Sequence, residues 1–219
     1  MRSLSLTFVI ALLVSPCVIA TPMPPMVKRG NHPGGSGHAN PTSPWPNVEL
    51  QLRGLPESSL DAPVTHGVFA QCGKPSVREA HGDEVNHWRL FFAIGAEQSI
   101  SFDMVKRGTN DLHGVVGVIG RTYAVSDKGV LFVPMLPSPH MNVRGVLDLL
   151  NENGLLRYKY APSGEGCRCW VKSVVELLKA KGLLHDADDR FPQFEASIGC
   201  LWKADGSHTP KPIEPGTFH

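Results

Sequence analysis

The stretch NHWRLFF, residues 86–92, decides the fold together with GCRCWV, residues 166–171. The first stretch is apolar and aromatic and has the length of a buried strand. The second opens a segment in which apolar residues recur with helical spacing. A histidine on a strand and a cysteine at a helix start are the two halves of a thiol active site. His87 and Cys167 are therefore the first candidates for chemistry in this chain.

Other stretches with strand patterns lie on both sides of residues 86–92. In residues 99–104, three apolar side chains alternate with polar ones, which places the apolar set on one face of a strand. Residues 95–98, GAEQ, separate this strand from the preceding one and suit a hairpin turn. The remaining predicted strands cover residues 48–52, 64–72, 115–125 and 130–136.

Two amphipathic helices are expected after these strands. The first covers residues 141–152, and the second covers residues 167–181, with Gly182 as its stop. Residues 155–161 are expected to form one more strand, which leads into the second helix. Strands first and helices afterwards predict the α+β class, in which helices cover an antiparallel sheet.

The N-terminal residues have the pattern of a secretory signal peptide. Arg2 supplies a positive charge, residues 4–20 are almost wholly apolar, and Ala20 is small enough for cleavage. The dibasic pair Lys28-Arg29 suits removal of a short propeptide, and the alternative is two solvated charges in an extended segment. We therefore predict a secreted, extracellular protein.

Four segments follow from these patterns. The signal peptide covers residues 1–20, and a propeptide with a disordered leader rich in Gly, Pro and Ser covers residues 21–46. Residues 47–203, about 155 in number, are enough for a single α+β domain with a hydrophobic core. Residues 204–219 contain Pro and Gly and are expected to form an extended C-terminal tail.

Charge and hydropathy argue against nucleic acid binding and against a membrane-spanning segment. The chain has 21 basic and 20 acidic residues, and residues 1–29 hold three of the basic ones and no acid. The remainder, with 18 basic and 20 acidic residues, contains no run of Lys and Arg that could follow a phosphate backbone. We therefore expect no nucleic acid binding. No apolar run after residue 20 is long enough to cross a bilayer, so we expect no membrane span.

Two motifs resemble those of lecithin:retinol acyltransferase-like proteins. Residues 87–92, a turn and residues 101–103 resemble the histidine hairpin of that group. Cys167, followed three residues later by Trp170, is similar to its nucleophile helix. The order of histidine before cysteine is that of circularly permuted papain-like folds. The resemblance implies a permuted papain-like arrangement with Cys167 as nucleophile and His87 as base.

The chain departs from that group at three positions. Gly166 stands where the group has an asparagine, and Cys169 stands where it has a histidine. The third polar member is a histidine there, whereas this chain offers Ser99, Ser101 and Asp103. Asp103 is the candidate that could orient an imidazole, so the candidate catalytic set is Cys167, His87 and Asp103.

A wider resemblance covers roughly residues 48–184. The motifs NHW, SISFDM and GCRxWV resemble those of an uncharacterised domain of filamentous-fungal proteins. This resemblance implies a fungal origin and brings no known activity.

The expected chemistry of the thiol follows from its position. A helix N-terminus and a neighbouring imidazolium both favour the thiolate, and the first N–H groups of the helix can stabilise an oxyanion. Gly164 and Gly166 would let a substrate approach the backbone closely. Arg168 is expected to be a solvated residue of the first turn.

The number of cysteines favours a rival interpretation. After removal of the signal peptide, the four cysteines are Cys72, Cys167, Cys169 and Cys200, and an even number in an oxidising compartment suggests disulfides. Cys167 and Cys169 are too close in a helix to pair with each other. A disulfide at Cys167 would exclude catalysis. The usual Cys-x-x-Cys spacing of zinc sites is absent, and we expect no metal and no cofactor.

Two functions remain open at the level of sequence. The first is a secreted fungal protein of effector-like type, acting on an unknown extracellular or host target. The alternative is a thiol hydrolase or acyltransferase that uses Cys167 and His87.

Overall fold

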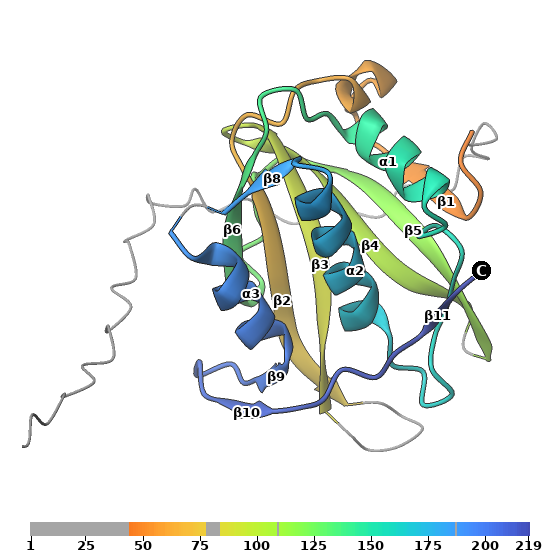
Figure 1. The fold of residues 1–219 in the computed structure, drawn as a ribbon, viewed down its shortest axis with the longest axis vertical. Coiled ribbons are helices and arrows are strands. Elements are labelled where there is room, and N and C mark those ends of the chain that lie inside the picture. Colours follow the sequence, from red (N-terminus) through yellow and green to blue (C-terminus); the bar gives the residue numbers. More distant parts are fainter. Residues whose placement is uncertain (1–43, 78–83, 109, 187) are drawn as a thin grey trace, which may run out of the picture. The chain divides into compact units, whose positions relative to one another are not determined.

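A computed structural model describes residues 44–77, 84–108, 110–186 and 188–219. The signal peptide, the dibasic pair Lys28-Arg29 and most of the predicted leader lie outside the described residues. In the described part, strands come first and helices follow, as the sequence predicts (Figure 1).

One nine-stranded sheet dominates the fold and is mostly antiparallel, curling into a half-barrel. Its strands are β1 (Val48–Gln51), β2 (Val68–Val77), β3 (Glu84–Gly95), β4 (Gln98–Gly108), β5 (Asp111–Arg121), β6 (Gly129–Pro137), β7 (Tyr158–Lys159), β8 (Leu184–His185) and β11 (Thr217–Phe218). The order is β11-β7-β5-β4-β3-β2-β6-β8, and β1 pairs with β5 in parallel. The prediction of an antiparallel sheet is therefore confirmed for the main strands and wrong for β1.

Three helices accompany this sheet: α1 (Val143–Glu152), α2 (Cys167–Ala180) and α3 (Arg190–Ile198). A short 3₁₀ helix (Glu57–Leu60) and a second, two-stranded sheet of β9 (Cys200–Trp202) and β10 (His208–Pro210) complete the described elements. The α2 helix runs in front of β3 and β4, and α3 lies beside β6 (Figure 1). This is the α+β arrangement with helices on a sheet that the sequence predicts.

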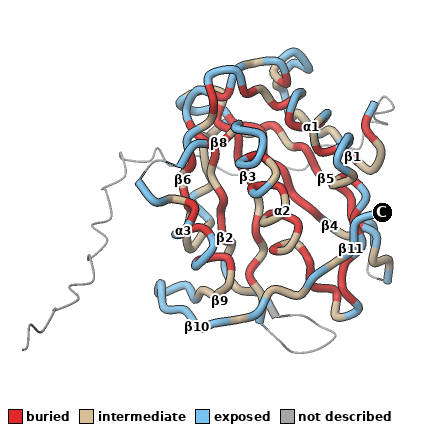
Figure 2. Tube along the Cα trace, viewed as in Figure 1, coloured by how far each residue is buried: buried red, intermediate tan, exposed pale blue. Residues whose placement is uncertain are grey.

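The hydrophobic core lies between the sheet and α2. Trp88, Leu90 and Phe92 alternate along β3 and are fully buried. Phe102 of β4 packs against Phe92, with ring centroids 4.7 Å apart, and Trp170 of α2 belongs to the same buried cluster. Figure 2 shows this buried layer running through the central strands and the facing side of the helix. The core fixes α2 on β3, and this contact sets the position of Cys167.

Local details differ from the sequence-based expectations in two places. Of the strand expected over 155–161, only Tyr158–Lys159 forms a strand, because Leu155 and its neighbours turn after α1. The α3 helix, which contains Pro192 in its first turn, is an additional element that the sequence-based expectations did not include. Proline is tolerated in a first helical turn, where N–H groups have no partner in the helix.

The C-terminal tail is part of the folded structure. Residues 208–210 pair with β9, and β11 pairs with β7. The tail is extended, as predicted, but its backbone bonds tie it to two sheets. It passes close to the start of α2 (Figure 1).

Candidate active site

The candidate site lies where β3 and β4 separate. The two strands pair from Gly95 and Gln98 down to Leu90 and Phe102, and the pairing ends there. Beyond this point β3 continues beside β2, and β4 continues beside β5. The separation leaves the side chains around His87 and Asp103 next to an opened strand edge.

Asp103 and His87 are joined across this separation. Nε2 of His87 is hydrogen-bonded to Oδ1 of Asp103. The guanidinium of Arg89 lies 3.6 Å from the other carboxylate oxygen. The Asp103 side chain is 12% exposed and that of His87 is 33% exposed, so the carboxylate is enclosed while the imidazole can be reached from solvent.

Cys167 is the first residue of α2 and lies against the β3 edge. Its Sγ atom is 3.9 Å from the carbonyl oxygen of Asn86, and its thiol interacts with the His87 imidazole. The structure thus brings the three candidate residues, Cys167, His87 and Asp103, together at one place.

The electrostatics of this set favour a charged pair. Burial by itself would lower the pKa of His87, but the bond to Asp103 and the contact with Cys167 outweigh it and raise that pKa to about 10. Burial would raise the pKa of Cys167, but His87, the backbone N–H of Trp88 and Arg168 together lower it. Asp103 is likewise buried, yet His87 and Arg89 lower its pKa. These pKa shifts favour the thiolate of Cys167, the imidazolium of His87 and the carboxylate of Asp103 over their neutral forms.

Cys72 shows the opposite behaviour and serves as an internal comparison. It is fully buried on β2, and burial raises the pKa of its thiol to about 12. A thiol of that kind is inert as a nucleophile. The two cysteines therefore differ in the environment that decides reactivity.

The start of α2 is held by two tyrosines. Gly166 is the N-cap and makes no side-chain cap bond. A Cβ atom at residue 166 would lie 2.7 Å from Oη of Tyr158 and 2.9 Å from a ring carbon of Tyr160. This explains why glycine stands where the acyltransferase-like group has asparagine. The expectation that Gly166 leaves room for a substrate is wrong, because the tyrosine rings fill that space.

Arg168 is buried rather than solvated, which corrects the sequence-based expectation. Its guanidinium pairs with Glu165 at 3.1 Å. It also donates to the carbonyl oxygens of Ile198, Lys211 and Pro212. Arg168 therefore ties the C-terminal tail to the first turn of α2 and adds positive charge near the thiol.

Asn86 was missed as a supporting residue at the sequence level. Its side-chain amide donates to the carbonyl oxygens of Gly73 and Trp202, and its Oδ1 accepts from the Trp202 N–H at 2.7 Å. These bonds lock β9 against the strand that carries His87. The signal in the sequence was an asparagine directly before the histidine in a stretch that is otherwise mostly apolar. Ser99 and Ser101, the other candidates for the third member, instead bond Tyr123 and the Ile119–Arg121 segment.

The expectation of a disulfide is not met among the described cysteines. Cys72, Cys167, Cys169 and Cys200 are all free. They belong to β2, to the first turn of α2 and to β9. Cys200 directs its thiol to the carbonyl oxygen of Ala196, and Cys169 interacts with the hydroxyl of Tyr158.

The described residues also bear on metals and membranes. Among them, no group of three or more His, Cys, Asp and Glu side chains is arranged to hold a metal ion. Within the same ranges, none of the helices has the length and apolar character needed to cross a bilayer.

Comparison with known proteins identifies a family. Residues 69–219 match the family described as Domain of unknown function (DUF7770). The chain belongs to this family. The matched segment contains β3, β4 and α2 and thus His87, Asp103 and Cys167. No curated protein and no solved structure matches the chain.

Proposed function

We propose that the chain is a cysteine-dependent hydrolase or acyltransferase that works through an acyl-thioester on Cys167. The observation that carries the proposal is the continuous contact from Asp103 through His87 to Cys167. A structural histidine needs neither a buried carboxylate bonded to its ring nor a helix-terminal thiol beside it. Activated nucleophiles need this combination.

The first half of the reaction follows from the positions of these groups. The thiolate of Cys167 attacks an acyl carbonyl carbon, a C–S bond forms, and the carbonyl oxygen becomes an oxyanion. The first N–H groups of α2 have no partners within the helix and can stabilise that oxyanion. The His87 imidazolium then donates its proton to the leaving group, and the acyl group stays on sulfur as a thioester.

The second half reverses these roles. Neutral His87 takes a proton from water or from another acceptor, which attacks the thioester carbon. The C–S bond breaks, the thiolate returns, and His87 is again protonated beside Asp103. Asp103 holds the ring in place throughout and stabilises its charged form. Water as acceptor makes the chain a hydrolase, and an alcohol or amine makes it an acyltransferase.

Acyl transfer to the enzyme from an activated ester tests this proposal. Native protein treated with p-nitrophenyl acetate should gain one acetyl group on Cys167, seen by intact mass and peptide mapping, together with release of nitrophenol. Cys167→Ala should lose both signals, and Cys200→Ala should keep them, because the Cys200 thiol is directed to the carbonyl oxygen of Ala196. Acetylation that is unchanged in Cys167→Ala, or none in the folded native protein, would contradict the proposal.

The site of action is a separate proposal. The apolar segment of residues 4–20 and the pair Lys28-Arg29 support export and processing, and with them an effector-like role outside the cell. Sequencing the N-terminus of material secreted by an expressing host tests it. A start at Gly30 is expected, and retention of residues 1–20 would contradict export.

A further inference from the structure

A second feature of the surface is a cavity of about 330 Å³ on the side of the sheet where β5 and β7 meet. Its lining includes Arg107, His113, Arg157 and Lys159, four basic side chains from distant parts of the chain. Cys167, His87 and Asp103 do not line it. The volume suits a small molecule, since binding pockets start at about 300 Å³.

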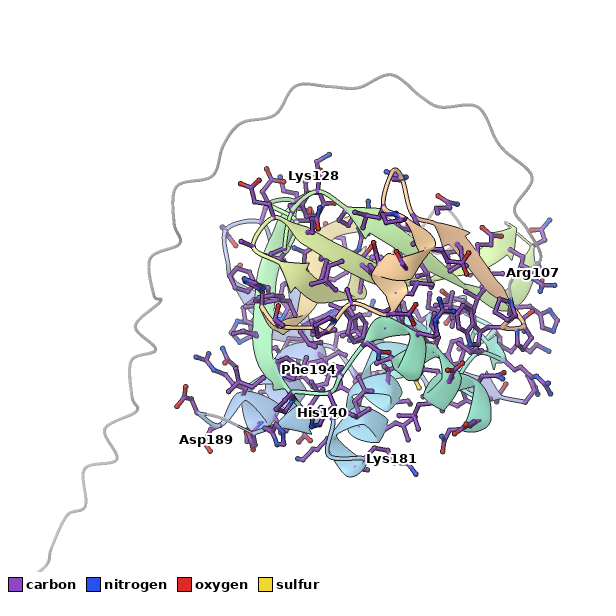
Figure 3. All side chains as sticks on the ribbon, turned by 90° about the horizontal axis from the view of Figure 1, so that it is seen from above. Arg107, Lys128, His140, Lys181, Asp189 and Phe194 are labelled. Carbon is purple, nitrogen blue, oxygen red and sulfur yellow. The ribbon has the colours of Figure 1, made fainter. Side chains whose placement is uncertain are left out.

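The basic side chains are brought together by strand pairing. His113 of β5 and Lys159 of β7 are direct cross-strand partners. Arg107 stands near the end of β4, next to the hairpin into β5, and its guanidinium bonds Oδ1 of Asn47. Arg157 directly precedes β7 and holds the backbone of His219 through its carbonyl oxygen. Figure 3 shows Arg107 at the right-hand edge of the molecule, well away from Lys128.

Positive charge is in excess at this cavity. In the described part of the chain, one acidic side chain contacts this group of four: Asp111 pairs with His113 at 2.7 Å. Arg107, Arg157 and Lys159 have no carboxylate partner among the described residues. Like charges on neighbouring strands destabilise a sheet, so this grouping brings no benefit to folding by itself.

We propose that this cavity binds a small molecule through a tetrahedral oxyanion, a phosphate or sulfate group. Arginine forks and a lysine ammonium are the usual partners of such groups. The concave shape and the small number of basic residues suit one such group rather than a nucleic acid backbone, which needs an extended track of cations. Tyr158 also lines the cavity, but its ring is buried against Tyr160 and Phe218, so the basic side chains supply the main contacts for a ligand.

NMR titration of the native protein tests this site. The probes are inorganic phosphate, inorganic sulfate, phenyl phosphate and phenyl sulfate, with chloride at equal ionic strength as reference. Saturable shifts are expected at the amides of His113, Gly114 and Lys159. Tighter binding of the phenyl esters than of the inorganic ions would assign the ligand to an organic ester, and the reverse order would assign it to the free ion.

Matched variants make the test specific. Arg157→Gln and Lys159→Gln should each weaken binding by about three- to fivefold, the effect of one exposed charge contact. Lys128→Gln removes the same charge from a distant exposed position and should leave binding unchanged. Cys167→Ala should also bind normally, because the cavity is independent of the proposed thiol chemistry. Shifts that do not saturate, or equal effects of Lys128→Gln and Lys159→Gln, would overturn the proposal.

Discussion

The imidazole of His87 bonds the carboxylate of Asp103 across the point where β3 and β4 cease to pair. In a regular ladder the two residues would be diagonal neighbours with their side chains directed out of the sheet. The separation of the strands opens the β3 edge to the first turn of α2. A single irregularity of the sheet therefore makes room for the thiol beside the histidine.

Removal of the Asp103 charge should weaken the thiolate. In Asp103→Asn the pKa of His87 falls, so less imidazolium is present to stabilise ionised Cys167. We expect iodoacetamide to label Cys167 about tenfold more slowly at pH 6, corresponding to one pKa unit. Asp111→Asn, which alters an exposed pair with His113, is the control and should not change the rate.

The pH dependence of stability should carry the signature of His87. Its pKa is raised to about 10 in the folded chain, so its contribution is complete below its unfolded value near 6.5 and disappears as the pH rises through 10. The difference in unfolding free energy between the native chain and His87→Gln should therefore shrink from pH 6.5 to pH 10. Urea unfolding at a series of pH values measures it, and a difference that stays constant over this range would refute the raised pKa.

Gly166→Ala should disturb the start of α2. The new methyl group would overlap Tyr158 Oη and Tyr160, and overpacking of this kind costs about 1–3 kcal/mol. Adding Tyr158→Phe removes the hydroxyl, so the double variant should recover part of the loss. Thermal unfolding compares them, with Gly108→Ala as control because no atom lies within 4 Å of its Cβ position. Equal stability of the two alanine variants would contradict the tight packing at Gly166.

Arg168→Met should loosen the C-terminal tail. The substitution removes the guanidinium partner of buried Glu165, which keeps its ion pair with Lys211 at 3.1 Å, and leaves three carbonyl oxygens without that donor, a loss of about 1–3 kcal/mol. Limited proteolysis should cut within residues 203–216 before the rest of the domain unfolds. Arg190→Met removes an arginine that bonds the neighbouring Gln193 on the same helix and should have little effect. Protection of the tail in Arg168→Met would show that other contacts hold it.

Local patterns explain how much of the fold was predictable. Alternation along residues 99–104 and helical spacing after Cys167 depend on neighbours in sequence, and both elements form as expected. The parallel pairing of β1 with β5 joins segments far apart in the chain, and no local signal specifies it. The α3 helix, which was not among the expected elements, has a local signal in the helical spacing of its buried residues Phe191, Phe194 and Ile198.

The candidate site was predictable in its members but not in its surroundings. His87 and Cys167 were identified because a strand histidine and a helix-start cysteine each have a local signature. The burial of Arg168 depends on the path of the tail, and the need for glycine at 166 depends on two tyrosines that approach from β7 and the residue after it. Both require the three-dimensional arrangement. The catalytic role of Cys167, His87 and Asp103 stays a prediction.

The rate of Cys167 alkylation as a function of pH tests the central claim most directly. Native protein is treated with iodoacetamide between pH 5 and pH 10, and tandem mass spectrometry separates Cys167 from Cys169. We predict rapid labelling well below the ordinary thiol pKa of about 8.5, and a shift of the profile toward that value in His87→Ala. A profile that rises only near pH 8.5 and is the same in His87→Ala would contradict the thiolate–imidazolium pair.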